Sequence, residues 1–427
     1  MKQLRSILVA LSRAIIASTF WIATRVAYHV EISGLNYDTK TPRTYLAMSH
    51  KRDLDPIVLV PTIVFHRGWR ALAGTVHFAL RGDAFAPGYL ARMVMHPRWL
   101  SFLLRFLSIG PVLRWLGVHP TDSLLRPAEE WIREVIRVEG DGRVGDVLAP
   151  FLIEDLATAA GEAYERVASS RLSQLLTWHY HHALQYYYGP EILIEPVRRA
   201  AQRRTVASIK EYLASLDAWL WGGGTLYGSP EGQLSPDGTL SPINSGLHRI
   251  LRTAPPETRI VPIFQIYDFM TTQRQRIFID FAPAIERAPK LPPTELDAQL
   301  RRAWLCSARF TCTQLASGFL MQASRDGLSS FTVDDMAKSI HMQATSLQKA
   351  GRHVDLQLLQ QPGARKRAEG FLAYAARHQL VRRNTQGAWT PTITETPIKV
   401  RPREVGYDQF PLVYAWNELQ EMLSVSS

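Results

Sequence analysis

The fold is decided by residues 43–65, which read RTYLAMSHKRDLDPIVLVPTIVF. The apolar run Arg43–Met48 predicts a strand, and the apolar run Ile57–Phe65 predicts a helix. Pro56 suits the first position of that helix, and Asp55 suits the cap before it. The polar residues between the two runs form a loop, so we expect a strand–loop–helix unit here.

Elements of both kinds continue along the chain. Runs of β-branched and aromatic residues predict further strands at Trp69–Thr75, Thr225–Gly228, Ile260–Tyr267 and Arg276–Phe281. Helical spacing predicts a helix over Val197–Trp221, which the glycines at 222–224 end. Because strands and helices alternate, we expect an α/β fold with a mixed sheet flanked by helices.

The length of 427 residues exceeds that of one ordinary compact domain. We predict an N-terminal region over residues 1–40, an α/β domain over 41–290 and a basic, mostly helical C-terminal domain over 291–427. Helical spacing with mixed charge from Pro120 to Tyr188 predicts a helical insertion at about residues 120–188 of the α/β domain. Phe410–Leu423 reads as a short amphipathic helix.

The first 30 residues predict a helix that associates with a membrane. Arg13 divides its apolar run, and the longest uncharged part, Ala14–Thr24, is shorter than the about 20 residues that span a bilayer. No small-residue cleavage site follows, so a signal peptide is disfavoured. We therefore expect an interfacial helix with Arg5, Arg13 and Arg25 facing headgroups, with a core-packed helix as the alternative.

Composition and charge narrow the classes of protein. Hydrophobic residues make up 46% of the chain and charged residues 20%, which is a globular composition and excludes a disordered chain. The net charge of +11 predicts anionic partners, which are nucleic acid, anionic lipid or a phosphorylated substrate. The two cysteines, Cys306 and Cys312, do not make a disulfide framework and are expected to be buried, so a reducing cytosolic compartment fits best.

A second apolar segment, Trp99–Val118, is interrupted only by Arg105 and Arg114 and has Gly110-Pro111 midway. A re-entrant or interfacial helix pair and a plain buried hairpin both fit this pattern.

His50 and Asp55 are the first candidates for chemistry. A histidine removes a hydroxyl proton near neutral pH, and it works better when a carboxylate holds one ring nitrogen. On one helix their five-residue offset would place them on different faces, but across a strand–loop–helix turn they can meet. The alternative is a loop histidine and a carboxylate that only caps a helix.

Two further segments carry candidate residues. Pro230, Glu231 and Gly232 stand in a turn-rich stretch after a predicted strand. A glutamate on such an exposed, rigid turn could accept hydrogen bonds from substrate hydroxyls. Pro262 interrupts the apolar strand Ile260–Ile263, which predicts a sheet edge or a bulge at this position. We also expect this strand to line an acyl-binding groove. Taken singly, the first is a surface turn and the second carries little information.

In this order, the three segments together resemble the glycerolipid acyltransferase family, which includes bacterial glycerol-3-phosphate and 1-acylglycerol-3-phosphate acyltransferases. The family's His-x4-Asp motif is matched by His50 and Asp55, its Pro-Glu-Gly motif by residues 230–232, and its proline in an apolar strand by Pro262. The resemblance covers roughly residues 40–285 in broken form. The basic helical part that follows is similar to the C-terminal region of the larger glycerol-3-phosphate enzymes.

The resemblance implies an O-acyltransferase of phospholipid biosynthesis in which His50 deprotonates the acceptor hydroxyl and Asp55 orients His50. The donor would be acyl-CoA or acyl-carrier protein, and the acceptor glycerol-3-phosphate or its 1-acyl form. Neither a covalent acyl-enzyme, a cofactor nor a metal is implied. The enzyme would be peripheral or monotopic on the cytoplasmic face of an anionic membrane. The implied substrate-binding positions are Pro230, Glu231, Gly232 and Pro262.

Two departures from the family concern the acceptor's phosphate. The family often has an arginine two residues after the glycine of Pro-Glu-Gly, where this chain has Leu234. Its second motif pairs a glycine with a downstream arginine that holds the phosphate; Gly110–His119 lacks that arginine, whereas Gly189–Arg199 ends in two. We therefore predict Arg198 and Arg199 as the phosphate clamp, since arginine binds phosphate with two parallel hydrogen bonds.

Other functions fit parts of the sequence. An acyltransferase acting on a non-phosphorylated lyso-lipid would suit Leu234. A nucleic-acid-binding protein would use Lys349–Arg403, with eleven Lys and Arg against three acids, which resembles a winged helix. It does not account for the N-terminal helix or the ordered motifs, so nucleic acid is not an expected partner. The three histidines of Trp178–His182 lack the four-residue spacing of helical metal pairs, so we predict no metal site there.

Overall fold

The computed structural model describes residues 2–34, 41–52, 55–67, 76–81, 104, 106–108, 110–115, 118–121, 126–232, 234–393 and 410–425. The chain divides into two compact units. Unit 1 comprises Met1–Val76 and the described residues from Leu220 onward, and unit 2 comprises His77–Trp219. The described residues of the regions predicted at 1–40 and 291–427 all fall within unit 1.

Unit 1 contains a mixed sheet, as the alternating pattern predicts. Its strands lie in the order β1-β9-β8-β2-β7. The pairs β1–β9, β8–β2 and β2–β7 are parallel, and β8–β9 is antiparallel. The strands predicted from residues 43–48, 225–228, 260–267 and 276–281 are confirmed as β2 (Thr44–Met48), β7 (Thr225–Gly228), β8 (Arg259–Asp268) and β9 (Arg276–Phe281), and β1 covers His29–Ser33.

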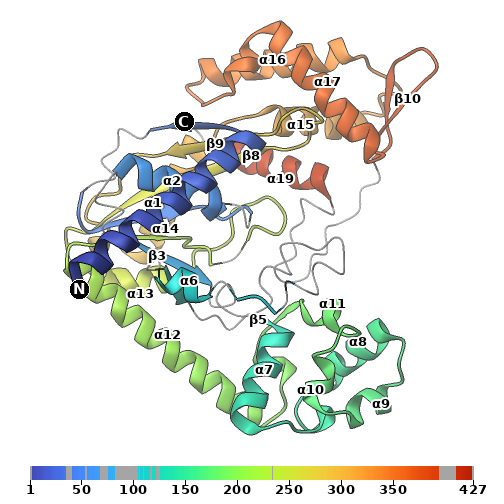
Figure 1. The fold of residues 1–427 in the computed structure, drawn as a ribbon. Coiled ribbons are helices and arrows are strands. Elements are labelled where there is room, and N and C mark those ends of the chain that lie inside the picture. The colour runs from blue at the N-terminus through green and yellow to red at the C-terminus, as the bar shows by residue number, and fades with distance from the viewer. Residues whose placement is uncertain are drawn as a thin grey trace. The chain divides into compact units, whose positions relative to one another are not determined.

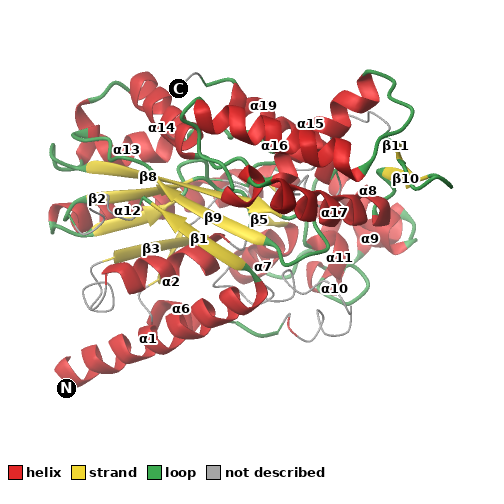
Figure 2. Ribbon diagram, turned by 90° about the horizontal axis from the view of Figure 1, so that it is seen from above, coloured by secondary structure: helices red, strands yellow, loops and turns green. Residues whose placement is uncertain are grey.

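Helices cover both faces of this sheet, which explains why its central strands are buried nearly throughout instead of alternating between buried and exposed residues. All five residues of β2 are buried. In Figure 2, α1 (Lys2–Ala27) and α2 (Asp55–Arg67) lie on one side of the strands, and α13 (Ser245–Thr253) and α14 (Pro293–Ser307) lie on the other. The Trp304 indole on α14 donates to the Ala47 carbonyl of β2 at 3.1 Å.

Of the two alternatives predicted for Pro262, an edge or a bulge, the structure excludes the edge. The proline is buried in β8, which has β2 on one side and β9 on the other. Regular pairing with β9 begins only at Ile263 opposite Phe281, whereas Ile260 bridges Ile285. The partner segment therefore carries one more residue than β8 between these two pairs, and the proline without an N–H stands where the ladder is irregular.

The C-terminal part of unit 1 is mostly helical, as predicted. Figure 1 shows α16 and α17 side by side near α15. The β10–β11 hairpin follows α17 and pairs antiparallel, and α19 packs on α15. The elements are α15 (Cys312–Arg325), α16 (Val333–Lys349), α17 (Gln361–Arg377), β10 (Val381–Arg383), β11 (Trp389–Pro391) and α19 (Pro411–Leu423), with short 3-10 helices η4 (Ala288–Lys290) and η5 (Leu356–Leu359). Cys312 is buried, but Cys306 is only partly buried.

Unit 2 is mostly helical and has an apolar core of its own, built around Trp131, Leu152, Leu172 and Leu184. Its elements are β3 (Val76–Arg81), α6 (Gly110–Trp115), β4 (Val118–Thr121), β5 (Arg126–Pro127), α7 (Ala128–Glu139), η2 (Val144–Asp146), α8 (Pro150–Ala160), α9 (Tyr164–Ser169), α10 (Leu172–Leu175), α11 (His181–Leu184), β6 (Tyr187–Tyr188), η3 (Pro190–Ile192) and α12 (Val197–Trp221). The first residue of β3 and the last two residues of α12 belong to unit 1. The predicted strand Trp69–Thr75 lies outside the described residues, as do nine of the twenty residues of the apolar segment Trp99–Val118.

Candidate active site

The two segments expected to carry chemistry follow neighbouring strands. His50 comes two residues after β2 ends, and Pro230 comes two residues after β7 ends. Because β2 and β7 are parallel, their carboxyl ends meet at one edge of the sheet, which is where α/β proteins bind ligands.

The predicted His50–Asp55 pair is formed. His50 Nδ1 lies 3.1 Å from Asp55 Oδ2. The side chain of Asp55 is fully buried, whereas that of His50 is 16% exposed and reaches solvent. Since a carboxylate only accepts, Nδ1 carries the proton and the Nε2 lone pair is available as a base.

Asp55 does not act as an ordinary helix cap. Its Oδ2 reaches back along the chain and accepts from the amides of Lys51 at 2.7 Å and Arg52 at 2.9 Å. Its Oδ1 accepts from the Tyr267 hydroxyl at 2.5 Å, and Gln265 Nε2 donates to that hydroxyl at 2.6 Å. These hydrogen bonds fix the orientation of the carboxylate that contacts the imidazole. Sequence reasoning missed Tyr267 and Gln265, whose only signal is polarity at alternate positions of an apolar strand.

Glu231 is not on an exposed turn, and that prediction is wrong. It is 3% exposed, and its two oxygens accept from the amides of His50 at 2.7 Å and Ser241 at 2.8 Å. The His50 carbonyl in turn accepts from the Ser235 amide at 3.0 Å. Burial raises the pKa of Glu231 to about 6, against the opposing charge of Lys51. In this arrangement Glu231 holds the His50 backbone, and its role in substrate binding stays a prediction.

Pro230 and Gly232 shape the turn that places Glu231. Gly232 has a φ of +69°, which an L side chain rarely adopts. Its amide donates to the Ser229 carbonyl at 3.2 Å, and the Pro230 carbonyl accepts from the Asn244 amide at 2.7 Å. Pro230 is buried, whereas Gly232 is exposed.

Lys51, next to His50, points away from solvent. It is 2% exposed, its Nζ donates to the Gly238 carbonyl at 2.8 Å, and it forms an ion pair with Glu418 at 3.4 Å. This contact brings the C-terminal helix α19 to the loop that carries His50. No motif in the sequence connects these two segments.

Compared with models of known protein families and with curated protein sequences, the chain matches none.

Arg198 and Arg199, the predicted phosphate clamp, lie in unit 2 on the first turn of α12. Both pair with Glu195, at 2.8 Å and 3.2 Å, and both are well exposed. Their role stays a prediction.

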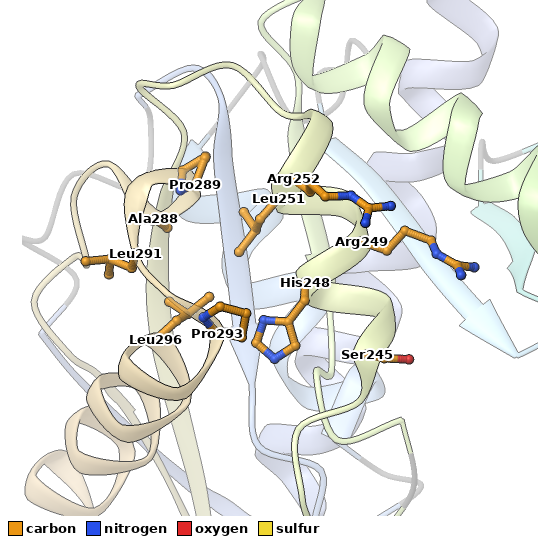
Figure 3. A pocket seen from close by; sticks show the side chains of 10 residues that line it. All are labelled: Ser245, His248, Arg249, Leu251, Arg252, Ala288, Pro289, Leu291, Pro293 and Leu296. Atoms are coloured by element: carbon orange, nitrogen blue, oxygen red, sulfur yellow. The ribbon is translucent and has the colours of Figure 1, made fainter.

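A second histidine that pairs with a carboxylate, His248, lines a groove of about 460 Å³ between α13, η4 and the start of α14 (Figure 3). His248 Nε2 is 3.0 Å from Asp297 Oδ1, close to the separation in the His50 pair. The side chain of Asp297 is 34% exposed, however, so solvent screens it and leaves it less firmly held. Prolines and leucines form much of the groove's lining.

In the described parts of the chain, no three His, Cys, Asp or Glu side chains cluster as metal ligands would. His179, within the histidine-rich segment, lies 3.4 Å from Glu162.

Proposed function

We propose that this protein is an O-acyltransferase that moves a fatty acyl group from acyl-CoA or acyl-carrier protein to a hydroxyl of glycerol-3-phosphate or 1-acylglycerol-3-phosphate. The observation that carries the proposal is the His50 Nδ1–Asp55 Oδ2 contact of 3.1 Å at the carboxyl end of the sheet. The buried carboxylate fixes the tautomer, and the solvent-reaching imidazole presents Nε2 to an acceptor hydroxyl.

The proposed step transfers one proton and one acyl group. His50 Nε2 takes the proton of the acceptor hydroxyl while the oxygen attacks the thioester carbonyl carbon. The C–S bond of the tetrahedral intermediate then breaks, and the thiolate leaves with the proton from the imidazolium. Asp55 stabilises that imidazolium and stays ionised throughout.

The membrane is proposed as the place of reaction because of α1. Ala10, Ala17 and Thr24 form its buried stripe and recur every seven residues. Large apolar side chains project from the other side, with Leu11, Ile15, Ile22 and Val26 all more than half exposed. Among the described residues, none of the helices combines the length and apolar character that crossing a bilayer requires. A helix with this pattern suits the interfacial plane of a cytoplasmic membrane surface.

The basic C-terminal segment lends less support to nucleic-acid binding than its charge suggests. Arg367 is buried and pairs with Asp268. Arg352 is buried and donates to the carbonyls of Leu305 and Met422. These cations stabilise the packing of α17 and α19, so they do not form a free basic surface.

A non-phosphorylated lyso-lipid acceptor stays the second candidate, favoured by the apolar, buried Leu234 in place of the family's arginine.

The test is His50→Ala, assayed with radiolabelled acyl-CoA and each of the two proposed acceptors. Loss of the base should lower kcat by about 10²–10⁴-fold. His248→Ala is the matched control because it removes a histidine of similar exposure and similar distance to a carboxylate, and it should keep wild-type kcat. Equal turnover by wild type and His50→Ala would remove His50 from the mechanism, and a wild type inactive with every acyl donor and acceptor would refute the proposed function.

A further inference from the structure

Lys51 is a buried cation next to the proposed catalytic pair, His50 and Asp55. Its ammonium contacts the Gly238 carbonyl and Glu418, and its backbone amide donates to Asp55 Oδ2 at 2.7 Å. The residue directly precedes Arg52, whose amide makes the second bond to the same oxygen. A shift of the Lys51 side chain would therefore move two of the donors that orient Asp55.

The counter-ion, Glu418, is itself held in place. It is 4% exposed and lies on α19. Its Oε2 accepts from Gln314 Nε2 on α15 at 2.7 Å, while Oε1 faces Lys51. Burial raises the pKa of Glu418, and the charge of Lys51 is the largest opposing influence. An ion pair with both members buried is sensitive to loss of either partner.

The same helix holds the second loop of the site. Gly238 has a φ of +96°, and a Cβ there would lie 2.1 Å from the Tyr414 carbonyl, so the loop touches α19 backbone to backbone. Asn417 Nδ2 donates to the Asp237 carbonyl at 3.1 Å, and Glu421 Oε2 accepts from the Leu240 amide at 2.6 Å. This loop also supplies the Ser235 and Ser241 amides that bond to His50 and Glu231.

We propose that α19 is a positioning element of the active site, and that Glu418 is a positioning residue that acts through Lys51 on the His50–Asp55 pair. Neither Lys51 nor Glu418 touches substrate, because both side chains are buried. The kinetic test rests on the proposed acyl transfer, whereas the labelling test below does not.

The first experiment measures kcat and KM of the full-length Glu418→Gln variant with acyl-CoA and lysophosphatidate. Glutamine keeps the shape and can still accept from Gln314, but it removes the counter-ion. We expect kcat to fall at least about tenfold with KM changed by less than about threefold, because geometry at His50 changes while substrate contacts do not. Gln420→Ala, on the exposed side of α19, is the control and should match wild type.

The double variant Lys51→Met with Glu418→Gln separates positioning from simple charge compensation. The single variant Glu418→Gln leaves the ammonium of Lys51 buried without its counter-ion, which should lower the melting temperature. The double variant lacks both members of the ion pair, so its melting temperature should lie closer to that of wild type. Its kcat should stay low, because methionine cannot donate to the Gly238 carbonyl. Recovery of kcat together with stability would overturn the proposal, as would an unimpaired Glu418→Gln.

A readout independent of turnover is the rate at which diethyl pyrocarbonate modifies His50, measured by mass spectrometry of its peptide. We expect faster modification in Glu418→Gln than in Gln420→Ala, because a loosened loop releases the imidazole from Asp55. If wild type transfers no acyl group but the labelling rates differ, the function fails and the positioning role stands. If wild type is active and both kcat and labelling are unchanged, the positioning role fails.

Discussion

Asp55 orients the imidazole of His50. Four donors converge on one buried carboxylate, from the His50 ring, the Lys51 and Arg52 amides and the Tyr267 hydroxyl. A carboxylate held in this way does not rotate, so the histidine ring it contacts is restricted as well. Each donor also stabilises the charge of this fully buried carboxylate.

Glu231 gives a pH dependence of stability with a definite sign. Burial raises its pKa from 4.5 to about 6. Below pH 4.5 the group is neutral in both folded and unfolded chains, whereas above pH 6 the folded state holds a carboxylate that burial disfavours. Its contribution to stability is therefore lost as pH rises through this window, by about 2 kcal/mol at most.

The Glu231→Gln variant lacks this titration. Its free energy of unfolding should change less between pH 4 and pH 7 than that of wild type, by about 2 kcal/mol. A constant offset is also expected, because the glutamine amide faces one of two backbone N–H groups that need an acceptor. Denaturant titrations of both proteins at matched pH measure the difference, and parallel pH curves would contradict the buried, raised-pKa carboxylate.

Among the secondary-structure elements, α1 has an unusual distribution of residues. Its small residues Ala10, Ala17 and Thr24 face the protein, and α1 packs against α2. Trp21 of α1 lies edge-on to Phe65 of α2 at 5.8 Å, and both rings are exposed. The apolar surface of α1 thus extends onto α2. A soluble helix would normally turn its large apolar side chains inward.

Changing Leu11, Ile15 and Ile22 together to serine should weaken vesicle binding at least about tenfold, because each buried side chain of this kind contributes about 1.5–3 kcal/mol. The fold should persist, since all three are more than half exposed. Met342→Ser removes a comparably exposed side chain from α16 and should leave binding unchanged. Sedimentation with liposomes measures the partition, and equal pelleting of the two variants would argue against α1 as the docking helix.

For the whole molecule, the net charge of +11 predicts a second, electrostatic contribution to membrane binding. Vesicles of phosphatidylcholine with added phosphatidylglycerol should bind more tightly than phosphatidylcholine alone. Raising salt from about 0.1 M to about 1 M shortens the screening length from about 10 Å to about 3 Å, so this preference should disappear while the apolar contribution persists. Equal affinity for both vesicles at low salt would show that the charge does not act at the membrane.

Much of the sheet and its helices was predictable because the spacing of apolar residues and the positions of turn residues are local signals. The strand–loop–helix at residues 43–65 and the helix Val197–Trp221 are both confirmed. Pro262 predicted an edge or a bulge, and the sequence alone could not choose between them; the structure shows an irregularity in the partner segment that accommodates the proline. The prediction for Glu231 was wrong. A Pro-Glu-Gly turn normally lies at the surface. Here Glu231 is buried because the loop after β2 and the segment that carries Ser241 pack against it.

The sequence by itself determined the α/β class, the strand and helix positions that place His50 and Glu231, and the His50–Asp55 pair, because each depends on residues close together in the chain. Only the tertiary structure decided what holds that pair. Tyr267 contacts Asp55 from 212 residues away, and Glu418 contacts Lys51, the residue after His50, from more than 300 residues away. Such contacts depend on which strands become neighbours and where a C-terminal helix packs, and those arrangements follow from burial of the whole core, not from any local pattern.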